Sequence, residues 1–185
     1  MDKVTRCHWC NSSELYQEYH DTEWGKPVHN DQKLFEFLAL ESFQAGLSWI
    51  TILKKRPHFR AAFDNFDVEK ISNYTNEKIE TLLRNEGIIR HRGKIEATIN
   101  NAKCFIEIQK EHGSFGHFIW AFVNHTPQDN QVEEANQIPS QTPLSITISK
   151  DLKKRGFKFF GPTTVYAFMQ ATGMVNDHLN NCSFK

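Results

Sequence analysis

The chain has 185 residues, and its 22 Lys and Arg balance its 22 Asp and Glu to give a formal net charge of zero. Hydrophobic residues make up 39% and charged residues 24%, with 6 Pro and 9 Gly, which excludes long-range disorder, a collagen-like repeat and a disulfide miniprotein. The balanced charge excludes a polybasic nucleic-acid coat but not a local basic surface, and the length fits one domain with a full core.

The N-terminal stretch from Met1 to Arg6 is polar and predicts no signal peptide, and nowhere does the chain hold the ~18 apolar residues of a membrane span. We therefore expect a cytoplasmic protein with no membrane partner. Its four cysteines should stay reduced in that compartment rather than form disulfides. They are Cys7, Cys10, Cys104 and Cys182. Cys104 lies within a helical pattern and is expected to be a small core residue.

Apolar residues recur at helical spacing along the first part of the chain. Asp31 is placed to cap a helix over 34–45, whose apolar side chains follow an i, i+3, i+4, i+7 row. Ser48 is placed to cap a short helix over 49–55, and Pro57 suits the first turn of a separate helix that follows. Further helices are expected over 57–63, 75–83, 95–112 and 114–122.

The rest of the chain is helical on both sides of a polar segment. Gly87 is expected to close the preceding helix in a left-handed conformation. Residues 126–147 contain three prolines and little periodicity, which predicts a surface excursion. Helices are expected around 149–155 and over 162–172. No alternating run predicts a strand of useful length, so the fold class is all-α, a single domain over 1–185 with two lobes and a cleft.

Cysteines and histidines gather near both ends of the chain. Cys7 and His20 lie near the start, and His178 and Cys182, four residues apart, would share one face of a helix. Two thiolates and two imidazoles make a closed tetrahedral Zn²⁺ site, which would tie the termini together. Cys10 competes with this assignment, because Cys7 and Cys10 have the spacing of a zinc knuckle. The alternative is that these are ordinary polar and partly buried side chains near chain ends that no metal joins.

Glu41 falls on the apolar row of its helix, where a carboxylate is costly unless it is paired or used. Three of the four Trp and two of the four Tyr lie within the first 49 residues. Ring planes around one inward carboxylate suit a pocket for a flat, cationic heterocycle. The alternative is an aromatic core in which Glu41 pairs with an Arg or Lys.

Two basic turns bounded by glycine lie at 87–94 and 153–164. In the second, Pro162 begins a helix, whose first N–H groups would form a phosphate site beside Lys158 and Thr164. Either turn alone is also typical of a solvated helix connection. Both together, with the basic run 54–56, predict positive charge gathered on one side of a neutral protein.

Six stretches form a combination more specific than any single motif, and they run over nearly the whole chain, from Cys7 to Cys182. They are Leu15 to Gly25, Gln44 to Thr51, Gly87 to Ile95, Arg155 to Phe159, Phe168 to Ala171 and Val175 to His178. Together they closely resemble the bacterial, Tag-type 3-methyladenine DNA glycosylase I family.

The resemblance implies a helix-hairpin-helix glycosylase fold, with two helical lobes and the base pocket between them. It also implies a structural zinc that joins segments 1–30 and 174–185 and has no open position for a reactive water. The zinc ligands that it implies are Cys7, His20, His178 and Cys182, so that Cys10 is left out.

The same resemblance assigns the pocket and the DNA contacts. Glu41 matches the family's pocket carboxylate and is expected to be the catalytic residue as well as a base contact. The base-binding rings that it implies are Trp9, Tyr16, Tyr19 and Trp49, with Trp24 a less direct contact. The DNA-anchoring hairpin is expected near 155–164, through Gly156, Lys158, Gly161 and Thr164. Its glycines are five residues apart, unlike the short Gly-x-Gly form of the wider superfamily.

The implied activity is base excision repair by a monomer that flips 3-methyladenine out of alkylated double-stranded DNA, hydrolyses the N-glycosidic bond and releases the free base. No lysine stands out as a Schiff-base nucleophile, so we expect no strand cleavage. Many enzymes of the superfamily carry an Asp after the hairpin, and the only candidate nearby is Asp177. Two other hypotheses are a zinc-stapled helical module that binds bent or damaged DNA without chemistry, and a helical metallohydrolase with an open zinc position.

Overall fold

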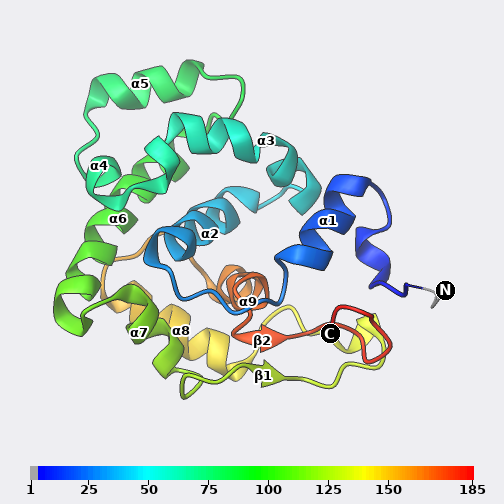
Figure 1. Ribbon diagram of the computed structural model, residues 1–185. Coiled ribbons are helices and arrows are strands. Elements are labelled where there is room, and N and C mark those ends of the chain that lie inside the picture. The colour runs from blue at the N-terminus through cyan, green and yellow to red at the C-terminus, as the bar shows by residue number, and fades with distance from the viewer. Residues whose placement is uncertain (1–3) are drawn as a thin grey trace.

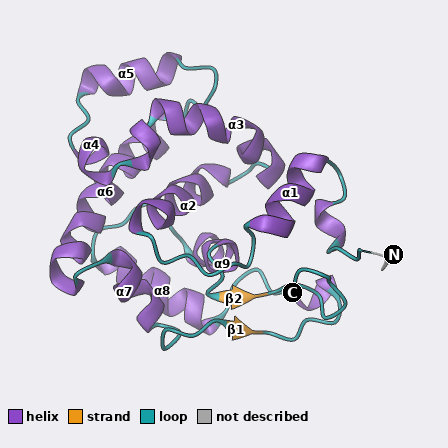
Figure 2. Cartoon of the chain, viewed as in Figure 1, coloured by secondary structure: helices purple, strands orange, loops and turns teal. Residues whose placement is uncertain are grey.

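The computed structural model describes residues 4–185, so the first three residues of the polar N-terminal stretch lie outside it. The elements in chain order are η1 (His8–Cys10), α1 (Glu14–Thr22), α2 (Asp31–Gln44), α3 (Trp49–Ala62), η2 (Asp64–Phe66), α4 (Val68–Ser72), α5 (Asn76–Arg84), α6 (Arg92–His112), α7 (Phe115–Ala121), β1 (Gln128–Asp129), η3 (Ala135–Gln137), α8 (Pro143–Lys154), α9 (Pro162–Ala171) and β2 (Val175–Asn176). Helices dominate the fold (Figure 2), which confirms the all-α prediction.

Helix α2 lies at the centre of the molecule, with α3 to α7 around one side of it and α1, α8, α9 and the C-terminus on the other (Figure 1). Every residue of α2 from Leu34 to Phe43 is buried. A helix that is apolar nearly all round packs in the interior, which explains its central place. Its C-terminal end, which carries Glu41, is thereby held between the two groups of helices.

Side-chain caps begin most of the other helices. Ser13, Thr75 and Ser114 each accept a hydrogen bond from a backbone N–H in the first turn of α1, α5 and α7. These caps satisfy N–H groups that have no partner inside the helix. The starts of these helices therefore follow local sequence signals.

The N-terminus of α2 differs from the prediction. Asn30, not Asp31, is the cap, and its side chain accepts from the Lys33 N–H. The Asp31 carboxylate instead accepts from the N–H groups of Phe115 and Gly116, at 2.9 and 2.8 Å. Asp31 therefore joins the start of α2 to the start of α7, a long-range use that helical periodicity does not reveal.

Helix α3 is continuous through Pro57, so the break predicted there is wrong. Arg56 and Phe59, on either side of the proline, are both buried and fix the helix on the core. Tertiary packing thus outweighs the hydrogen bond that proline removes. Gly87 also differs from the prediction, because it does not take the left-handed conformation; a Cβ there would lie 2.8 Å from His58, so close packing requires the glycine.

The surface excursion is shorter than predicted, because α8 already begins at Pro143. Within it, β1 pairs in parallel with β2, with Gln128 opposite Val175 and Asp129 opposite Asn176. Strands of two residues have no readable periodicity, so the sequence did not predict them. Across residues 4–185, no helix is long and apolar enough to cross a membrane.

Candidate functional site

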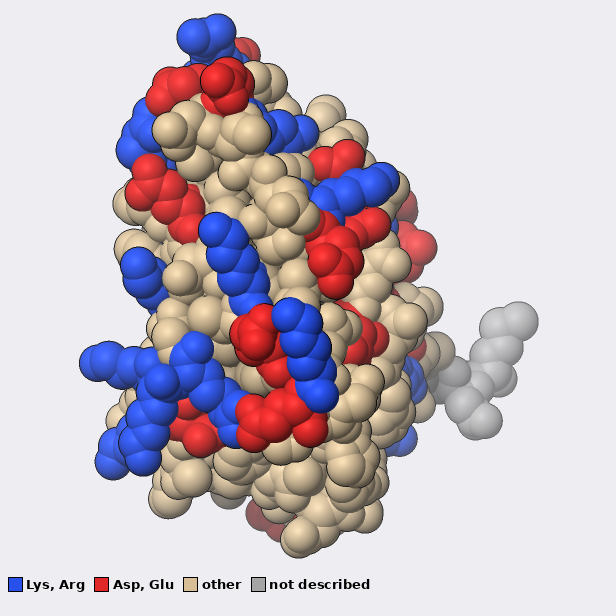
Figure 3. Space-filling view, turned by 90° about the vertical axis from the view of Figure 1, so that its left-hand side faces the viewer, with Lys and Arg blue, Asp and Glu red and all other residues tan. Residues whose placement is uncertain are grey.

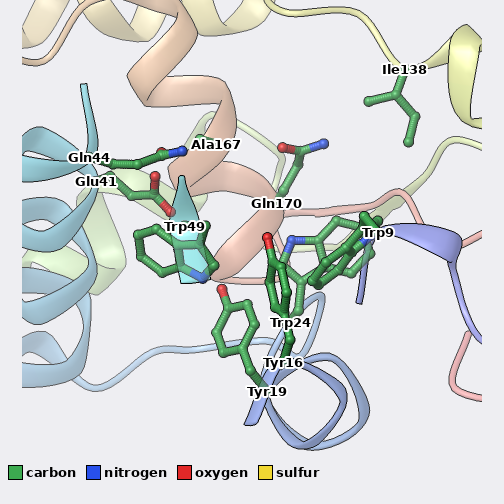
Figure 4. Close-up of a pocket in the computed structure, with 10 residues that line it drawn as sticks. All are labelled: Trp9, Tyr16, Tyr19, Trp24, Glu41, Gln44, Trp49, Ile138, Ala167 and Gln170. Carbon is green, nitrogen blue, oxygen red and sulfur yellow. The ribbon is translucent and has the colours of Figure 1, made fainter. Parts of the chain in front are cut away.

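A cavity of about 230 Å³ opens beside the C-terminal end of α2 (Figure 4). Its volume falls below the ~300 Å³ at which sites for drug-sized ligands begin, and suits a single planar ring system. The residues that line it are Trp9, Tyr16, Tyr19, Trp24, Glu41, Gln44, Trp49, Ile138, Ala167 and Gln170. The structure therefore brings together all five residues that the sequence predicted for a base pocket, from η1, α1, α2 and α3.

The carboxylate of Glu41 lies at the inner end of this cavity. The residue is 4% exposed, and its Oε2 has no hydrogen-bond partner among the described residues. Burial alone raises the pKa of Glu41 to about 8. A buried polar atom without a partner is rare in folded proteins, and here it is aimed at a cavity, so it marks a place for a ligand that donates a hydrogen bond or carries positive charge.

The ion pair offered as an alternative for Glu41 is made by another residue of the same helix. Glu36 accepts from Arg56 at 2.7 Å and from Arg60 at 2.8 Å, and Arg56 also pairs with Glu23. These arginines hold the pKa of Glu36 below its usual range against the effect of burial, which alone would raise it. Within residues 4–185, no salt bridge involves Glu41.

Aromatic rings form the rest of the wall. The Trp9 ring lies 4.8 Å from that of Tyr16 and 5.0 Å from that of Trp24, both edge-on, and Tyr19 lies 5.8 Å from Trp49. The indole Nε1 of Trp49 is buried and, like Glu41 Oε2, has no partner among the described residues. Edge-on packing holds the rings in fixed orientations and leaves flat faces and polar edges toward a ligand.

Four lining residues were not singled out from the sequence: Gln44, Ile138, Ala167 and Gln170. Gln44 and Gln170 are ordinary amides in helical patterns, and nothing in their spacing marks them. Ile138 belongs to the polar segment that was expected to be a surface excursion. An isolated apolar residue among polar ones was the only available signal, and it is a weak one. Trp24 lines the cavity directly.

The predicted metal cluster assembles near the chain ends. Cys7, His20, His178 and Cys182 are all buried, and their ligand atoms lie within 4.8 Å of one another. Cys182 Sγ lies 3.5 Å from His178 Nδ1 and 3.6 Å from His20 Nε2. In a tetrahedral site with Zn–S of about 2.3 Å and Zn–N of about 2.0 Å, sulfur and nitrogen ligands lie about 3.5 Å apart. The four residues therefore fit a zinc ion.

The ring nitrogens that face away from the cluster have partners of their own. His20 Nδ1 lies 2.7 Å from Asp21 Oδ1, and His178 Nε2 lies 3.0 Å from the Trp24 carbonyl oxygen. Such contacts orient a histidine so that its free nitrogen faces a metal. Burial lowers the pKa of His178 to about 4, which keeps the ring neutral as a ligand must be. Asp21, itself clamped by Arg6, was not singled out from the sequence.

Cys10 lies outside the cluster although it is fully buried. Its thiol donates to the Cys7 carbonyl oxygen, with Sγ 3.1 Å from that oxygen. The four-residue set implied by the resemblance is thus the one that the fold brings together. Cys104, expected in the core, is only partly buried and lies beside Gly156 of the hairpin.

The predicted hairpin is the turn between α8 and α9. Asn101 of α6 fixes the backbone of this turn by two hydrogen bonds. Its Oδ1 accepts from the Lys158 N–H and its Nδ2 donates to the Lys158 carbonyl, both at 2.8 Å. Gly156 has φ +95°, a conformation that favours glycine. Gly161 has ordinary backbone angles, and a Cβ there would meet nothing within 4 Å, so the protein interior does not explain this glycine.

The outer surface of the hairpin is exposed. Lys158 and Phe159 both face solvent, and Thr164 lies partly exposed in the first turn of α9. No side chain caps that turn, so its N–H groups are available to a ligand. The second basic turn lies close by, because the His91 ring at the start of α6 is 6.1 Å from that of Phe159.

Several basic residues of the predicted positive surface form hydrogen bonds or ion pairs with other parts of the protein. Lys94 is buried and donates to the carbonyl oxygens of Phe43 and Ala45 at the end of α2, Arg56 is in the core network, and Arg155 pairs with Glu111 and Asp151. Figure 3 shows Lys and Arg gathered at the lower left of one face, with Asp and Glu interspersed elsewhere. Positive charge is therefore local and narrower than the sequence predicted.

Known proteins resemble this chain over nearly its whole length. A family model described as methyladenine glycosylase matches residues 9–185. The chain is 51% identical over 182 residues to the DNA-3-methyladenine glycosylase of Haemophilus influenzae, covering 98% of each. It is 50% identical over 179 residues to DNA-3-methyladenine glycosylase 1 of Escherichia coli, covering 97% of this chain and 96% of that one. A crystal structure of a 3-methyladenine DNA glycosylase I variant in complex with 3-methyladenine has a TM-score of 0.95 at 40% identity, covering 97% of each chain.

Proposed function

The chain belongs to the methyladenine glycosylase family, and from this premise we propose that it excises 3-methyladenine from alkylated double-stranded DNA. The base is flipped out of the duplex into the cavity beside α2, and the N-glycosidic bond is hydrolysed. The observation that carries the proposal is the buried carboxylate of Glu41, which among the described residues has no cationic partner and faces a ring-lined cavity.

Glu41 distinguishes the damaged base from normal adenine by charge. Adenine methylated at N3 within DNA carries a positive charge, which lowers the raised pKa of Glu41 and so favours loss of its proton when the base enters. The resulting carboxylate attracts the cation far more strongly in a water-poor pocket than it would in water. The lesion leaves as a neutral molecule, so strong general-acid assistance is unnecessary. As the bond to the sugar breaks, the same carboxylate favours the developing positive charge on the sugar. Glu41 is thus a recognition residue first and an electrostatic catalyst second.

Trp9, Tyr16, Tyr19 and Trp49 hold the flipped base by stacking and by their polar edges. Rings packed edge-on or tilted against one another present a preformed slot, which lowers the entropy lost when the base is bound. None of the residues that line the cavity is a lysine, which supports hydrolysis without a Schiff base and without strand cleavage.

The turn between α8 and α9 anchors the DNA backbone. Lys158 supplies charge, and the uncapped N–H groups at the start of α9 donate hydrogen bonds to a phosphate. Gly156 and Gly161 have no side chain and Thr164 has a short one, so the DNA backbone can approach this turn closely. The absence of any contact for a Cβ at Gly161 supports a surface kept open for a partner.

Zinc held by Cys7, His20, His178 and Cys182 acts as a structural cross-link and takes no part in the reaction. All four positions of a tetrahedral ion are filled by protein, which leaves no place for a reactive water. We place the enzyme in the cytoplasm as a monomer.

Excision from methylated DNA, with the released bases separated by chromatography, tests the proposal. Glu41→Gln should keep the fold and lower the release of 3-methyladenine by about 100-fold, the effect of losing one preorganised electrostatic group. Glu36→Gln is a matched control on the same helix: it weakens a buried ion pair and should lower thermal stability while retaining excision. Wild-type turnover by Glu41→Gln, or no release of free base by the wild type, would overturn the assignment.

A further inference from the structure

Gln170 forms part of the pocket wall opposite Glu41, and a hydrogen bond to Asp177 fixes its side chain. Its Nε2 donates to Asp177 Oδ2 at 2.9 Å, in a part of the structure just outside the cavity. Figure 4 shows the oxygen end of the amide on the side of Glu41 and Gln44, and the nitrogen end on the side of Ile138. The side chain therefore turns an acceptor, not a donor, toward the space in which a ligand lies.

Asp177 dictates this orientation because it can only accept hydrogen bonds. It is 2% exposed, and Tyr166 and Asn130 donate to it at 2.5 and 2.6 Å, in addition to Gln170. No cation pairs with it anywhere in the described chain. A carboxylate surrounded by three donors forces each to present hydrogen to it. If the Gln170 amide were reversed, its oxygen would face the carboxylate and both groups would lose a hydrogen bond.

Charge recognition by Glu41 leaves one distinction unmade. Adenine and guanine methylated at N3 both become cations, so a carboxylate attracts either. At position six of the ring adenine carries an amino group, which donates, and guanine a carbonyl oxygen, which accepts; guanine also carries an amino group at position two. A pocket with a fixed acceptor facing position six attracts the amino group of the adenine lesion and repels the carbonyl oxygen of the guanine lesion.

We propose that Asp177 is a positioning residue that turns the Gln170 carbonyl into the pocket, and that this carbonyl selects cationic purines with an amino group at position six over those with a carbonyl oxygen there. This inference rests on the proposed function. It also gives Asp177 a role other than that of a group acting on the sugar, since its carboxylate is fully engaged by neutral donors. A site built to pair with a donor rejects ligands that lack it, because its own buried group is then left without a partner.

The test uses DNA treated with a methylating agent, which carries both 3-methyladenine and 3-methylguanine, and measures the initial rate of release of each base in one reaction. Gln170→Met removes the acceptor at similar length, and Asp177→Asn frees the amide to turn. Gln109→Met is the matched control, because Gln109 Nε2 donates to the Asp31 carboxylate at 2.8 Å in the same way but lies outside the pocket. Thermal melting and zinc content are recorded for each variant.

The wild type should release 3-methyladenine in preference to 3-methylguanine. Gln170→Met and Asp177→Asn should each lower that ratio by about tenfold, as expected for one oriented hydrogen bond, and Gln109→Met should keep it. The ratio isolates selectivity, because a general loss of stability slows both releases together. An unchanged ratio in Gln170→Met overturns the role of Gln170, and an unchanged ratio in Asp177→Asn alone overturns the positioning role of Asp177. A wild type that releases neither base instead contradicts the proposed function itself.

Discussion

Glu41 could be singled out from the sequence because a carboxylate on an apolar helical row contradicts the pattern around it. Its aromatic neighbours were marked in the same way, by an unusual density of rings near the N-terminus. Gln170 gave no such signal, since an amide near a helix end is common on any surface, and Asp177 was marked only by the family resemblance and for a different role. Their meaning lies in a contact between α9 and the segment after it, which only the folded chain creates.

Burial of Glu41 makes the stability of the protein depend on pH. Its pKa is raised by burial to about 8, above the ~4.3 of an unfolded chain, so between these values the folded state holds a proton that the unfolded state has lost. The free energy of unfolding should therefore fall as pH rises from about 4.5 to about 8, in total by on the order of 5 kcal/mol. Glu41→Gln should lack this component.

Urea denaturation of the wild type and Glu41→Gln at pH 5.5 and pH 8 measures the effect. The difference between the two proteins removes the contribution of every other titrating group, including the metal ligands. Wild-type and variant stabilities that change in parallel between the two pH values would contradict a protonated Glu41 in the folded state.

The helix ends, rather than the helix faces, shape the functional surfaces. The start of α9 and the turn before it form the hairpin, and the end of α2 carries Glu41 toward the cavity. Both helix boundaries lie close to where the sequence predicted them, because glycine, proline and charge patterns mark helix ends. The hydrogen bonds that support these two helix ends were not predicted. Asn101 bonds to the hairpin 57 positions away, and Lys94 bonds to the end of α2 about 50 positions away.

Lys158→Ala tests the hairpin as the DNA anchor. Removal of one phosphate contact should weaken binding to DNA of any sequence and reduce the slope of log affinity against log salt by about one. Lys78→Ala serves as the control, because α5 lies at the far end of the molecule from α8 (Figure 1). Fluorescence anisotropy across a salt series gives both slopes, and equal slopes in the two variants would exclude the hairpin lysine as a contact.

Lys94→Met tests the support of α2. The ammonium group donates to the carbonyl oxygens of Phe43 and Ala45, at 3.1 and 3.2 Å, where a helix C-terminus attracts a cation. Loss of these bonds should cost about 1–3 kcal/mol of stability and loosen the turn beside Glu41, so that free 3-methyladenine binds more weakly.

Lys103→Met, on the exposed face of the same helix, should change neither property. Thermal melting and tryptophan fluorescence titration separate the two effects. Full ligand affinity in Lys94→Met would show that the end of α2 keeps its place without the lysine.

Across the whole molecule, the fold class, the central cavity and the gathering of two Cys and two His side chains from both ends were predicted, whereas the β1–β2 pairing and the continuity of α3 were not. The first group follows from composition, periodicity and a family resemblance that spans the chain. The second depends on long-range contacts, such as the ion pairs that Arg56, next to Pro57 in α3, makes with Glu23 and Glu36. Local signals cannot report such contacts.

Cys182→Ser tests the cross-link between the chain ends. The wild type should contain stoichiometric zinc, and loss of the metal, by mutation or by a chelator, should lower the melting temperature because residues 7 and 182 are no longer joined. Trp9 and Trp24 contact the cluster histidines, so base affinity should fall as well. Cys10→Ser, in a buried thiol outside the cluster, should keep its zinc by elemental analysis. A metal-free wild type with full stability would refute the cross-link.

One residue of the cavity wall comes from a mostly exposed loop. Ile138 reaches the ligand space from the stretch 133–141, in which every other residue is exposed. Insertions, deletions and side-chain changes in such a loop are tolerated far better than changes in a packed helix. A combinatorial library confined to residues 133–141 would therefore explore new ligand preferences while leaving Asn130, the buried Val132 and the α8 cap Thr142 unchanged, and natural divergence in substrate range can follow the same route.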